Sequence, residues 1–348
     1  MEQPASIRRK YRVGVIGCGR MGSTIDDEVV DHPAVQLPYS HAAAYCEIPE
    51  VELVAAADVN AAALTAFGDR WGVTRLYSDY RAMLDELDLD LVSVTTRATE
   101  RARIIFDAID AGVRAIFAEK ALACSLEEAD RIVERVEAEG VVLAVNCSRR
   151  WHDYYVKAEE LIREGAVGKL LHVSGSCPGG MSHSGSHAID VMRMFAGSDV
   201  EWVSGDVPPD KVRGNDDLPG NAYLRFASGA TGFYNALSTS QVEFEALGTE
   251  GRIRCTANGV AWEYERFSDP WRMPVRHLFP RPQRTRSATV NAVYDILRCL
   301  EHGGSPRCSA RDGRAALEIA VAVRESERRG GARVYLPLED RTLRIDSR

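Results

Sequence analysis

The feature that most constrains how this chain can fold is a glycine motif directly after its first apolar run. The run RVGVIG (12–17) leads into GCGRMG, which places Gly17, Gly19 and Gly22 in G-x-G-x-x-G spacing. In a strand–turn–helix unit, the first glycine allows a tight turn, the second lets the backbone approach a pyrophosphate, and the third lets the helix pack on the sheet. The motif and its context therefore predict a dinucleotide-binding site that also includes Arg20 and Met21.

An acidic residue at the end of the second strand-like run indicates which dinucleotide is bound. The run VELVAAAD (51–58) ends in Asp58, whose carboxylate can accept hydrogen bonds from both ribose hydroxyls of the adenosine and would repel a 2′-phosphate. The next residues, Val59 and Asn60, supply no arginine to hold such a phosphate. We therefore expect Asp58 and Val59 at the cofactor, and NAD rather than NADP as that cofactor.

The interval between the glycine motif and Asp58 is longer than the usual value of about 20 residues. The excess is STIDDEVVDHPAVQLPYS (23–40), called the insertion below, in which Pro33 and Pro38 break the expected helix before HAAAYCEI (41–48) resumes it. The insertion is predicted to lie beside the cofactor and to act as a lid or as part of a subunit contact. The alternative, a surface loop without a function, stays open.

Apolar strand-like runs alternate with helical segments through the first 146 residues. One of these helices, SLEEADRIVERVEAEG (125–140), opens with a capping box of Ser125 and Glu128. The alternation predicts an α/β fold, with a doubly wound parallel sheet in a Rossmann domain over residues 1–146. The expected strands are 12–17, 51–58, 89–96, 113–119 and 141–146.

The pattern changes after residue 146, where strand-like runs begin to follow one another without crossover helices. A hairpin is expected through Ala227–Ser228–Gly229. This second part, residues 147–348, is therefore predicted to be an α+β domain with a large and mostly antiparallel open sheet. Its helices are expected at about 151–164, 186–197, 287–302 and 309–328.

Charge and cysteine content limit the partners and the compartment. The formal net charge of −8 argues against nucleic acid as a partner. Eight cysteines without a C-x-x-C pair are predicted to be reduced core residues, neither a disulfide framework nor a zinc site. The N-terminal segment does not have the pattern of a signal peptide or a membrane anchor, so a cytoplasmic protein without a membrane partner is expected.

Four segments together resemble the Gfo/Idh/MocA oxidoreductase family: residues 12–22, VSVTTRATE (92–100), EKAL (119–122) and GSHAID (185–190). The resemblance covers nearly the whole chain and implies the two-domain fold predicted above. It also implies an NAD-dependent dehydrogenase that transfers hydride between nicotinamide and a hydroxyl-bearing carbon of a sugar, cyclitol or related polyol. A homo-oligomer, either a dimer or a tetramer, is implied as well.

Two of the matching motifs carry the residues to which the resemblance assigns chemistry. Glu119 and Lys120 match the family's E-K-P motif at the end of a strand, with Ala121 in place of proline, and both are expected at the cofactor. The Lys120 ammonium would contact the substrate hydroxyl and stabilise a developing alkoxide. In HSGSH (183–187), His187 matches the family's histidine and is predicted to be the general acid/base. His183 stands where aspartate is common and is expected to join these two as a catalytic and substrate-binding residue.

Further positions match the family only in part. Thr96 is kept from the family's T-P-x-x-x-H pattern, whereas Arg97 and Arg101 replace its proline and histidine. Thr96 and Arg97 are expected at the cofactor, and Arg101 on the helix surface. Asn146 and Arg150 are predicted to contact substrate, although the RRW segment (149–151) can instead be an exposed hinge.

Three alternatives remain open at this point. Two histidines four residues apart suggest a metal site, but Gly185 lies between them and no third ligand is apparent, so no metal is predicted. The chain can instead be a redox-neutral, NAD-dependent enzyme that cleaves glycosides. It can also be a non-catalytic NAD-binding regulator, although Lys120 and His187 argue against that, since a sensor needs neither.

Overall fold

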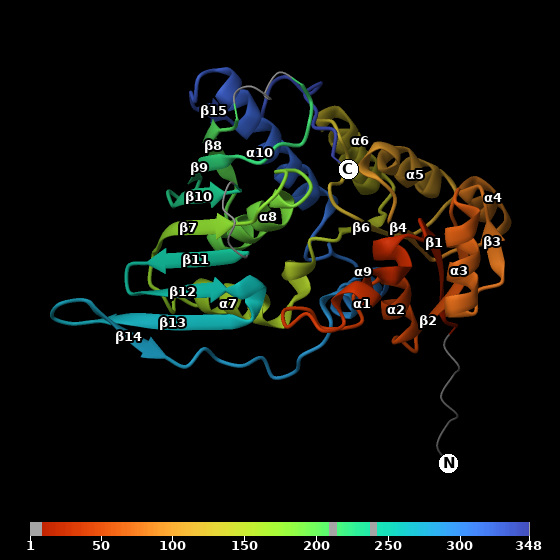
Figure 1. Cartoon of the computed structure of the whole chain (residues 1–348), viewed down its shortest axis with the longest axis horizontal. Helices are drawn as coiled ribbons and strands as arrows, with labels where there is room; N and C mark the ends of the chain where they lie inside the picture. Colours follow the sequence, from red (N-terminus) through yellow and green to blue (C-terminus); the bar gives the residue numbers. More distant parts are fainter. Residues whose placement is uncertain (1–8, 209–213, 237–241, 348) are drawn as a thin grey trace, which may run out of the picture.

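A computed structural model describes residues 9–208, 214–236 and 242–347 of the chain. Two β-sheets lie at the centres of two lobes, which stand side by side (Figure 1). The first lobe contains a six-stranded sheet and the second a nine-stranded sheet. None of the helices within the described ranges combines the length and the apolar character needed to span a bilayer.

The first sheet is parallel throughout, with the strand order β3-β2-β1-β4-β5-β6. Its strands are β1 (Tyr11–Ile16), β2 (Val51–Ala57), β3 (Arg75–Tyr77), β4 (Leu91–Val94), β5 (Ala115–Ala118) and β6 (Val142–Val145). Between them lie η1 (Arg20–Thr24), α1 (Ile25–Val29), α2 (His41–Cys46), α3 (Ala61–Trp71), α4 (Tyr80–Glu86), α5 (Ala98–Asp110) and α6 (Leu126–Ala138). Every residue of β4 and β5 is buried, as expected for strands covered by helices on both faces. The predicted Rossmann sheet is therefore confirmed, although β3 and α4 were not predicted.

The insertion interrupts the first helix as the prolines predict. Helix α1 ends at Val29, and α2 begins after Ser40, whose side chain caps it. The Asp26 carboxylate accepts hydrogen bonds from the backbone N–H groups of Tyr39 (2.6 Å) and Ser40 (3.1 Å). These bonds fasten the end of the insertion to α1, the short helix that follows the glycine motif.

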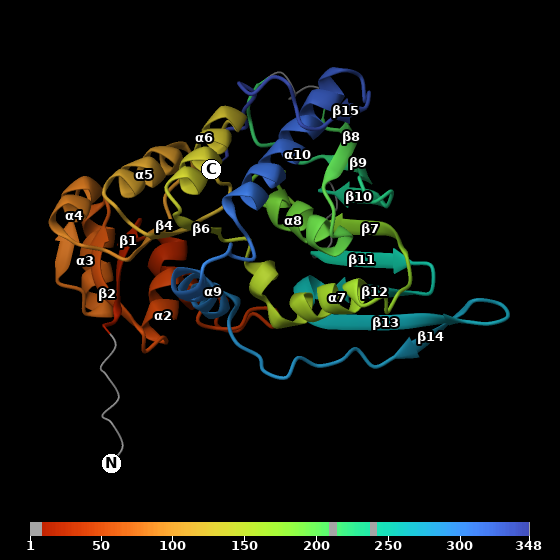
Figure 2. The same ribbon diagram turned by 180° about the vertical axis from the view of Figure 1, so that it is seen from behind.

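The second sheet has the order β14-β13-β12-β11-β7-β10-β9-β8-β15, and only its β7–β10 pair is parallel among the described strands. Helices α7, α8 and α10 cover one face (Figure 2). The predicted α+β fold and the hairpin through residues 227–229 are confirmed. The strands are β7 (Leu170–Ser176), β8 (Val200–Asp206), β9 (Asn221–Phe226), β10 (Thr231–Asn235), β11 (Glu243–Gly248), β12 (Gly251–Thr256), β13 (Ala261–Ser268), β14 (Met273–His277) and β15 (Val334–Tyr335). The helices are η2 (Ser148–Trp151), α7 (Asp153–Arg163), α8 (Gly185–Ala196), η3 (Ala257–Gly259), α9 (Ala288–His302) and α10 (Ala310–Arg328).

The C-terminal part of the chain returns to the first lobe more than once. Helix α9 packs against α2, β5 and β6, and α10 packs against both α6 and β8. Ser309 forms a bridge with Ala144 at the edge of β6. In the C-terminal tail, the Ile345 N–H donates a hydrogen bond to the Cys124 carbonyl (2.8 Å). The Leu343 carbonyl of the same tail accepts one from the Leu126 N–H (3.1 Å). The division of the chain at residues 146 and 147 therefore stays a proposal, since later segments help to cover the first sheet.

All eight cysteines fall within the described residues, and none of them is in a disulfide. Seven are buried, as predicted for core residues, whereas Cys46 at the end of α2 is exposed.

Candidate functional site

The glycine motif forms a turn that leaves room for a ligand. Gly17 has φ +100°, and a Cβ atom at Gly22 would lie 2.0 Å from the Gly17 carbonyl oxygen, so the protein's own backbone requires both glycines. A Cβ at Gly19 would meet nothing within 4 Å. The chain therefore does not use the space in front of Gly19, and a pyrophosphate fits there. Arg20 and Met21 follow at the start of η1, where the exposed Arg20 pairs with Glu28 at 2.7 Å.

Asp58 lies at the end of β2 with its carboxylate held by two backbone groups. It accepts hydrogen bonds from the N–H groups of Cys18 (2.7 Å) and Asn60 (2.8 Å). A carboxylate has about four acceptor positions, so acceptor capacity remains for ribose hydroxyls. Asp58 and Val59 line a cavity of about 410 Å³ together with Gly17, Gly19, Thr96 and Arg97.

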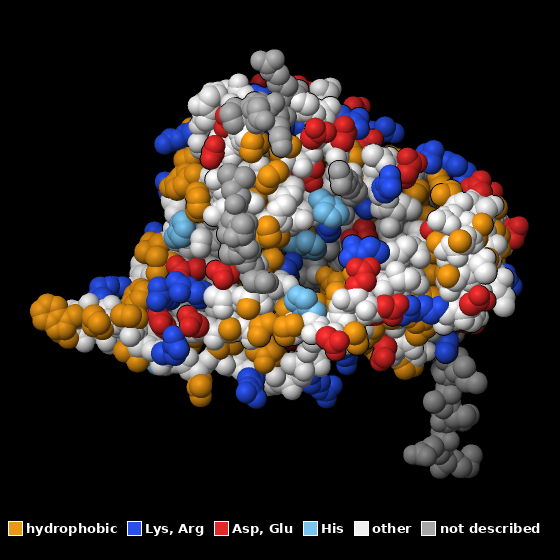
Figure 3. All heavy atoms as spheres, in the orientation of Figure 1, with side chains coloured by type: hydrophobic (Ala, Val, Ile, Leu, Met, Phe, Trp, Pro, Cys, Tyr) orange, Lys and Arg blue, Asp and Glu red, His pale blue; other side chains and the backbone are white. Residues whose placement is uncertain are grey.

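A second cavity, of about 620 Å³, continues from the first one and contains the residues predicted to carry the chemistry. The two cavities share Gly19, Thr95, Thr96 and Arg97, so they form one trough along the carboxyl ends of the parallel strands. Figure 3 shows a hollow between the two lobes, with histidine and basic side chains around it. The second cavity is lined by the predicted residues Gly19, Arg20, Met21, Thr96, Arg97, Glu119, Lys120, Asn146, His183 and His187.

Lys120 follows β5 and points across to the second lobe. Its Nζ donates a hydrogen bond to the His183 carbonyl oxygen at 2.8 Å. Burial lowers the pKa of Lys120, and the charge of Glu119 opposes that shift. The Lys120–Ala121 peptide bond is cis. The ammonium therefore lies at the junction of the two lobes, with a proton that is easier to remove than that of an exposed lysine.

Glu119 is buried beneath Lys120 in a polar network that the sequence did not reveal. Its Oε1 accepts a hydrogen bond from Asn146 Nδ2 (2.7 Å) and lies 3.3 Å from His41 Nε2. The other His41 nitrogen lies 2.8 Å from Ser93 Oγ. Burial alone would raise the pKa of Glu119, but the bond with His41 and the charges of His41 and Lys120 lower it to about 2. Glu119 is thus a fixed negative charge, and the Asn146 amide is directed to it.

His187 lies in the first turn of α8, facing the same cavity as Lys120. Its Nδ1 is buried and has no hydrogen-bond partner among the described residues. Burial, followed by the positive charges of Lys120 and Arg149, lowers the pKa of His187 well below its usual value. The imidazole is therefore neutral near pH 7 and can accept a proton.

His183 is exposed at the rim of the cavity, and its backbone is held by a carboxylate that no sequence pattern indicated. The Asp217 side chain accepts hydrogen bonds from the N–H groups of Ser182 (2.8 Å) and His183 (2.7 Å). Burial raises the pKa of Asp217, although those two bonds partly offset the effect. Asp217 therefore positions the segment whose carbonyl oxygen accepts the hydrogen bond from Lys120 Nζ.

Arg101 differs from its predicted placement, and Arg150 pairs with two carboxylates outside the two cavities. Arg101 is 2% exposed, so it is not a surface residue of α5; its guanidinium donates to the carbonyl oxygens of Thr96 and Ala121. Arg150 is not among the residues that line the two cavities, and its contact with substrate stays a prediction. Its guanidinium donates to the buried Asp190 carboxylate at 2.8–3.0 Å and pairs with Asp312 at 3.1 Å. Arg150 thus joins η2 to α8 and α10, because two carboxylates compensate its charge.

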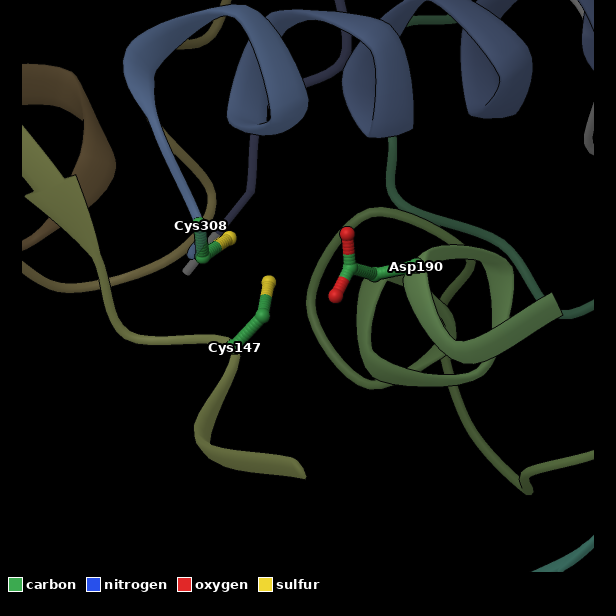
Figure 4. Close-up of side chains that lie close together, drawn as sticks. All are labelled: Cys147, Asp190 and Cys308. Carbon is green, nitrogen blue, oxygen red and sulfur yellow. The ribbon is translucent and has the colours of Figure 1, made fainter. Parts of the chain in front are cut away.

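Three buried side chains near Arg150 have the composition of a metal site. The ligand atoms of Cys147, Asp190 and Cys308 all lie within 4.8 Å of one another, and Figure 4 shows the two thiols and the carboxylate converging from three segments. Burial raises the pKa of Cys308 well above its usual value, which disfavours the thiolate that a metal needs. Arg150 already occupies the Asp190 carboxylate. We therefore interpret this cluster as core packing.

The chain matches known proteins over both lobes. Residues 11–147 match the family model described as an oxidoreductase family with an NAD-binding Rossmann fold, and residues 178–254 match the GFO/IDH/MocA C-terminal domain. A myo-inositol 2-dehydrogenase from Thermotoga maritima is 25% identical over 338 residues, which cover 90% of this chain and 96% of that protein. A levoglucosan dehydrogenase from Pseudarthrobacter phenanthrenivorans is 27% identical over 384 residues, covering 91% and 96%.

The solved structures agree on the fold. A levoglucosan dehydrogenase in complex with NADH and levoglucosan superposes with a TM-score of 0.80 at 23% identity, covering 95% of this chain and 100% of that chain. Both family domains are thus present in order, and the glycine turn, Asp58 and the Glu119–Lys120 pair lie along one trough. The chain belongs to the Gfo/Idh/MocA family of oxidoreductases, and its N-terminal domain is an NAD-binding Rossmann domain.

Proposed function

We propose that the protein is an NAD-dependent dehydrogenase that oxidises a hydroxyl-bearing carbon of a sugar, cyclitol or related polyol, or reduces the corresponding carbonyl. One observation carries the proposal. Lys120 and His187 line a single cavity that continues, through Gly19 and Thr96, into the cavity that contains Asp58. A dinucleotide lying along this trough has its adenosine at Asp58 and its nicotinamide end near Lys120. The names of the relatives, which include inositol and levoglucosan dehydrogenases, support this substrate class.

The proposed proton path uses the neutral imidazole of His187. When bound, NAD⁺ supplies the hydride acceptor. The substrate hydroxyl lies against Lys120 Nζ, whose positive charge stabilises the oxygen as its proton leaves. His187 accepts that proton, so the carbon loses a hydride and the oxygen loses a proton, and a carbonyl compound results. In the reverse direction the protonated imidazole returns the proton.

Glu119, His183 and Asp217 support these two groups. The fixed charge of Glu119 keeps Lys120 protonated against the cost of burial. Asp217 holds the His183 backbone, and the His183 carbonyl holds Lys120 Nζ. Loss of either contact would move the ammonium away from the hydroxyl. The side chain of His183 is exposed at the cavity rim and is proposed to bind a second hydroxyl of the substrate.

The test measures reduced nicotinamide with NAD⁺, and separately NADP⁺, against sugars, cyclitols and their phosphates. We expect NADH formation with at least one compound. His187→Asn should lower kcat by about 10²–10⁴, the usual contribution of general acid–base catalysis. Lys120→Met should lower kcat far more than it weakens NADH binding. Lys157→Met on α7, whose side chain pairs with Glu160 at 3.1 Å, is the matched control and should behave like the wild type.

Two results would contradict the dehydrogenase assignment. If NAD copurifies, is never released and glycosides are split without net reduction, the redox-neutral glycoside-cleaving alternative is correct. If NADH binds tightly while no compound turns over and the His187 and Lys120 variants bind it equally well, the regulatory alternative is favoured.

We also propose that the protein forms a homo-oligomer through the open face of its second sheet. No helix within the described ranges covers this face, which is turned to the viewer in Figure 1. Tyr223 and Phe233 pair across β9 and β10 on it and are 39% and 43% exposed. Sedimentation of the wild type and of the double variant Tyr223→Glu, Phe233→Glu should give a dimer or tetramer and a smaller species, respectively. A wild-type monomer would refute the proposal.

A cytoplasmic location is proposed from the cysteines. Eight free thiols without a disulfide suit a reducing compartment. Cell fractionation tests this location, and recovery of the protein outside the cytoplasm would refute it.

A further inference from the structure

Two further cavities lead away from the catalytic cavity beneath the insertion. A narrow one, of about 40 Å³, shares Tyr39 and Ser148 with the cavity that holds Lys120. An outer one, of about 400 Å³, shares Ala34, Gln36 and His152 with the narrow one. Neighbouring cavities thus have wall residues in common, so the three cavities lie next to one another in a row that begins at Lys120. The insertion contributes wall residues to all three.

The outer cavity has aromatic walls. Tyr154 and Trp262 stack with their ring centroids 6.3 Å apart, and Trp262 and Phe279 lie 5.0 Å apart. The Trp262 indole N–H donates to the Gly259 carbonyl at 2.9 Å, which fixes the orientation of the ring. A volume of about 400 Å³ falls within the range of small-molecule sites, about 300–1,000 Å³. Preordered aromatic faces of this kind suit the C–H faces of a sugar ring.

Two polar groups of the outer cavity, His152 and Gln36, suit hydroxyl groups of a ligand. Burial, followed by the charge of Arg149, lowers the pKa of His152 to about 4, so this imidazole is neutral at physiological pH. Gln36 is neutral as well. His152 Nδ1 and Gln36 Oε1 are buried without a hydrogen-bond partner among the described residues, which is a cost of about 1–3 kcal/mol for each group. A ligand rich in hydroxyls can satisfy such groups after a small shift of the insertion.

Arg149 lines the narrow cavity, and its guanidinium also suits a ligand with hydroxyl groups. Its guanidinium donates to the Asn258 side chain and lies 5.8 Å from the centre of the Tyr155 ring. Within the part of the chain that the structure describes, the groups that raise its pKa are Tyr155, a second tyrosine and a nearby thiol, and no carboxylate is among them. Its remaining N–H donors can therefore bind a glycosidic or hydroxyl oxygen that passes from one cavity to the other.

We propose that the outer cavity is a subsite for a second sugar ring, so that the preferred substrates are disaccharides or other glycosides. One ring is oxidised beside Lys120, the linkage passes Tyr39 and Arg149, and the second ring stacks on Trp262. This inference rests on the proposed dehydrogenase function, whose substrate class it narrows. It also gives the insertion a role in selecting substrates by size.

The test compares disaccharides with their constituent sugars in both binding and turnover. Calorimetric titration of the NADH-loaded protein with maltose, cellobiose, lactose and trehalose, and with glucose and galactose, needs no turnover. We expect at least one disaccharide to bind about tenfold more tightly than its constituent sugars. In turnover assays with NAD⁺, the ratio of kcat/KM for that disaccharide to kcat/KM for the single sugar should fall about tenfold in Trp262→Ala and in Gln36→Ala. Trp271→Ala, at a tryptophan that is 82% exposed, is the matched control and should leave the ratio unchanged.

The outcomes separate this inference from the function on which it rests. If single sugars are oxidised, disaccharides bind no more tightly and the ratio is the same in all variants, the subsite is refuted and the dehydrogenase stands. If nothing is oxidised but disaccharides bind in a manner that depends on Trp262 and Gln36, the dehydrogenase fails and the subsite stands. Gln36→Ala lies in a loop, so it reports on the subsite even if Trp262→Ala does not fold.

Discussion

Replacing Arg101 by methionine removes a buried guanidinium that connects two loops of the trough. It donates to the carbonyl of Thr96, which follows β4, and to the carbonyl of Ala121, which follows Lys120. Thr96 lines both cofactor cavities, and Lys120 lies in the adjoining turn. The substitution should therefore loosen both loops while it leaves the sheet intact.

The structure allows the cost to stability to be worked out. Two hydrogen bonds from a charged donor contribute about 1.5–3 kcal/mol each, so their loss costs about 3–6 kcal/mol. Burial lowers the pKa of Arg101 from 12.5 to about 10, which corresponds to a penalty of about 3 kcal/mol that the variant no longer carries. The net decrease in the free energy of unfolding should therefore be between about 0 and 3 kcal/mol, less than the loss of two buried bonds suggests.

Urea denaturation and fluorescence titration with NADH together test this reasoning. For Arg101→Met we expect the modest loss of stability above and a rise of about tenfold or more in the NADH dissociation constant. Arg101→Lys should weaken NADH binding too, because an ammonium lacks the planar fork that reaches two carbonyls. Arg135→Met, which removes a guanidinium on the neighbouring helix α6 that lines neither cavity of the trough, is the control. Wild-type NADH affinity in Arg101→Met would refute the positioning role.

Three further expectations concern individual carboxylates. The pKa of Glu119 is about 2 in the folded protein and 4.5 normally, so its ionised form stabilises the fold by roughly 3 kcal/mol above pH 4.5, and this contribution is lost as the pH falls toward 2. Urea denaturation should therefore show the wild type losing this stabilisation relative to Glu119→Gln between about pH 5 and 2, and a constant difference would contradict this. Asp58→Ala should raise the Kd for NAD about tenfold or more but hardly weaken NADP, as titration of both would show; equal losses would refute the role of the carboxylate. Asp190→Asn should destabilise the protein by about 3–5 kcal/mol in denaturation, because Arg150 and Arg193 lose a buried counter-charge; a change below about 1 kcal/mol would refute it.

Sequence patterns predicted the elements with strong local signals. The apolar runs of β1, β2 and β4–β6, the capping box at Ser125 and the spacing of the three glycines depend on neighbouring residues, so they can be recognised without a structure. Strand β3 has only three residues, which is too short for a periodic pattern. In the first sheet, the strands with long apolar runs were therefore predicted, and the short strand β3 was missed.

The side chains that were misplaced or missed depend on contacts between distant segments. Arg101 in ERAR looks like a surface residue, but Ala121 lies 20 positions later in the chain and close to it in space. Arg150 is fixed by Asp190 and Asp312, which lie 40 or more positions away. Nothing local marks His41 as the neighbour of Glu119, because 78 positions separate the two. The roles of Lys120 and His187 stay predictions, since they rest on the family resemblance and on the cavity that both line.

The repeated return of the C-terminal segments to the first lobe has a mechanical consequence. Two lobes joined by a single connecting segment can rotate about it, whereas lobes joined at several separate points are held in one relative orientation. Here β6 leads into η2, α9 lies against β5 and β6, and the tail pairs with the start of α6. We expect these contacts to suppress a wide hinge motion between the lobes. Dinucleotide and substrate would then enter and leave through local movement at the mouth of the trough, and the insertion is the segment placed to make it.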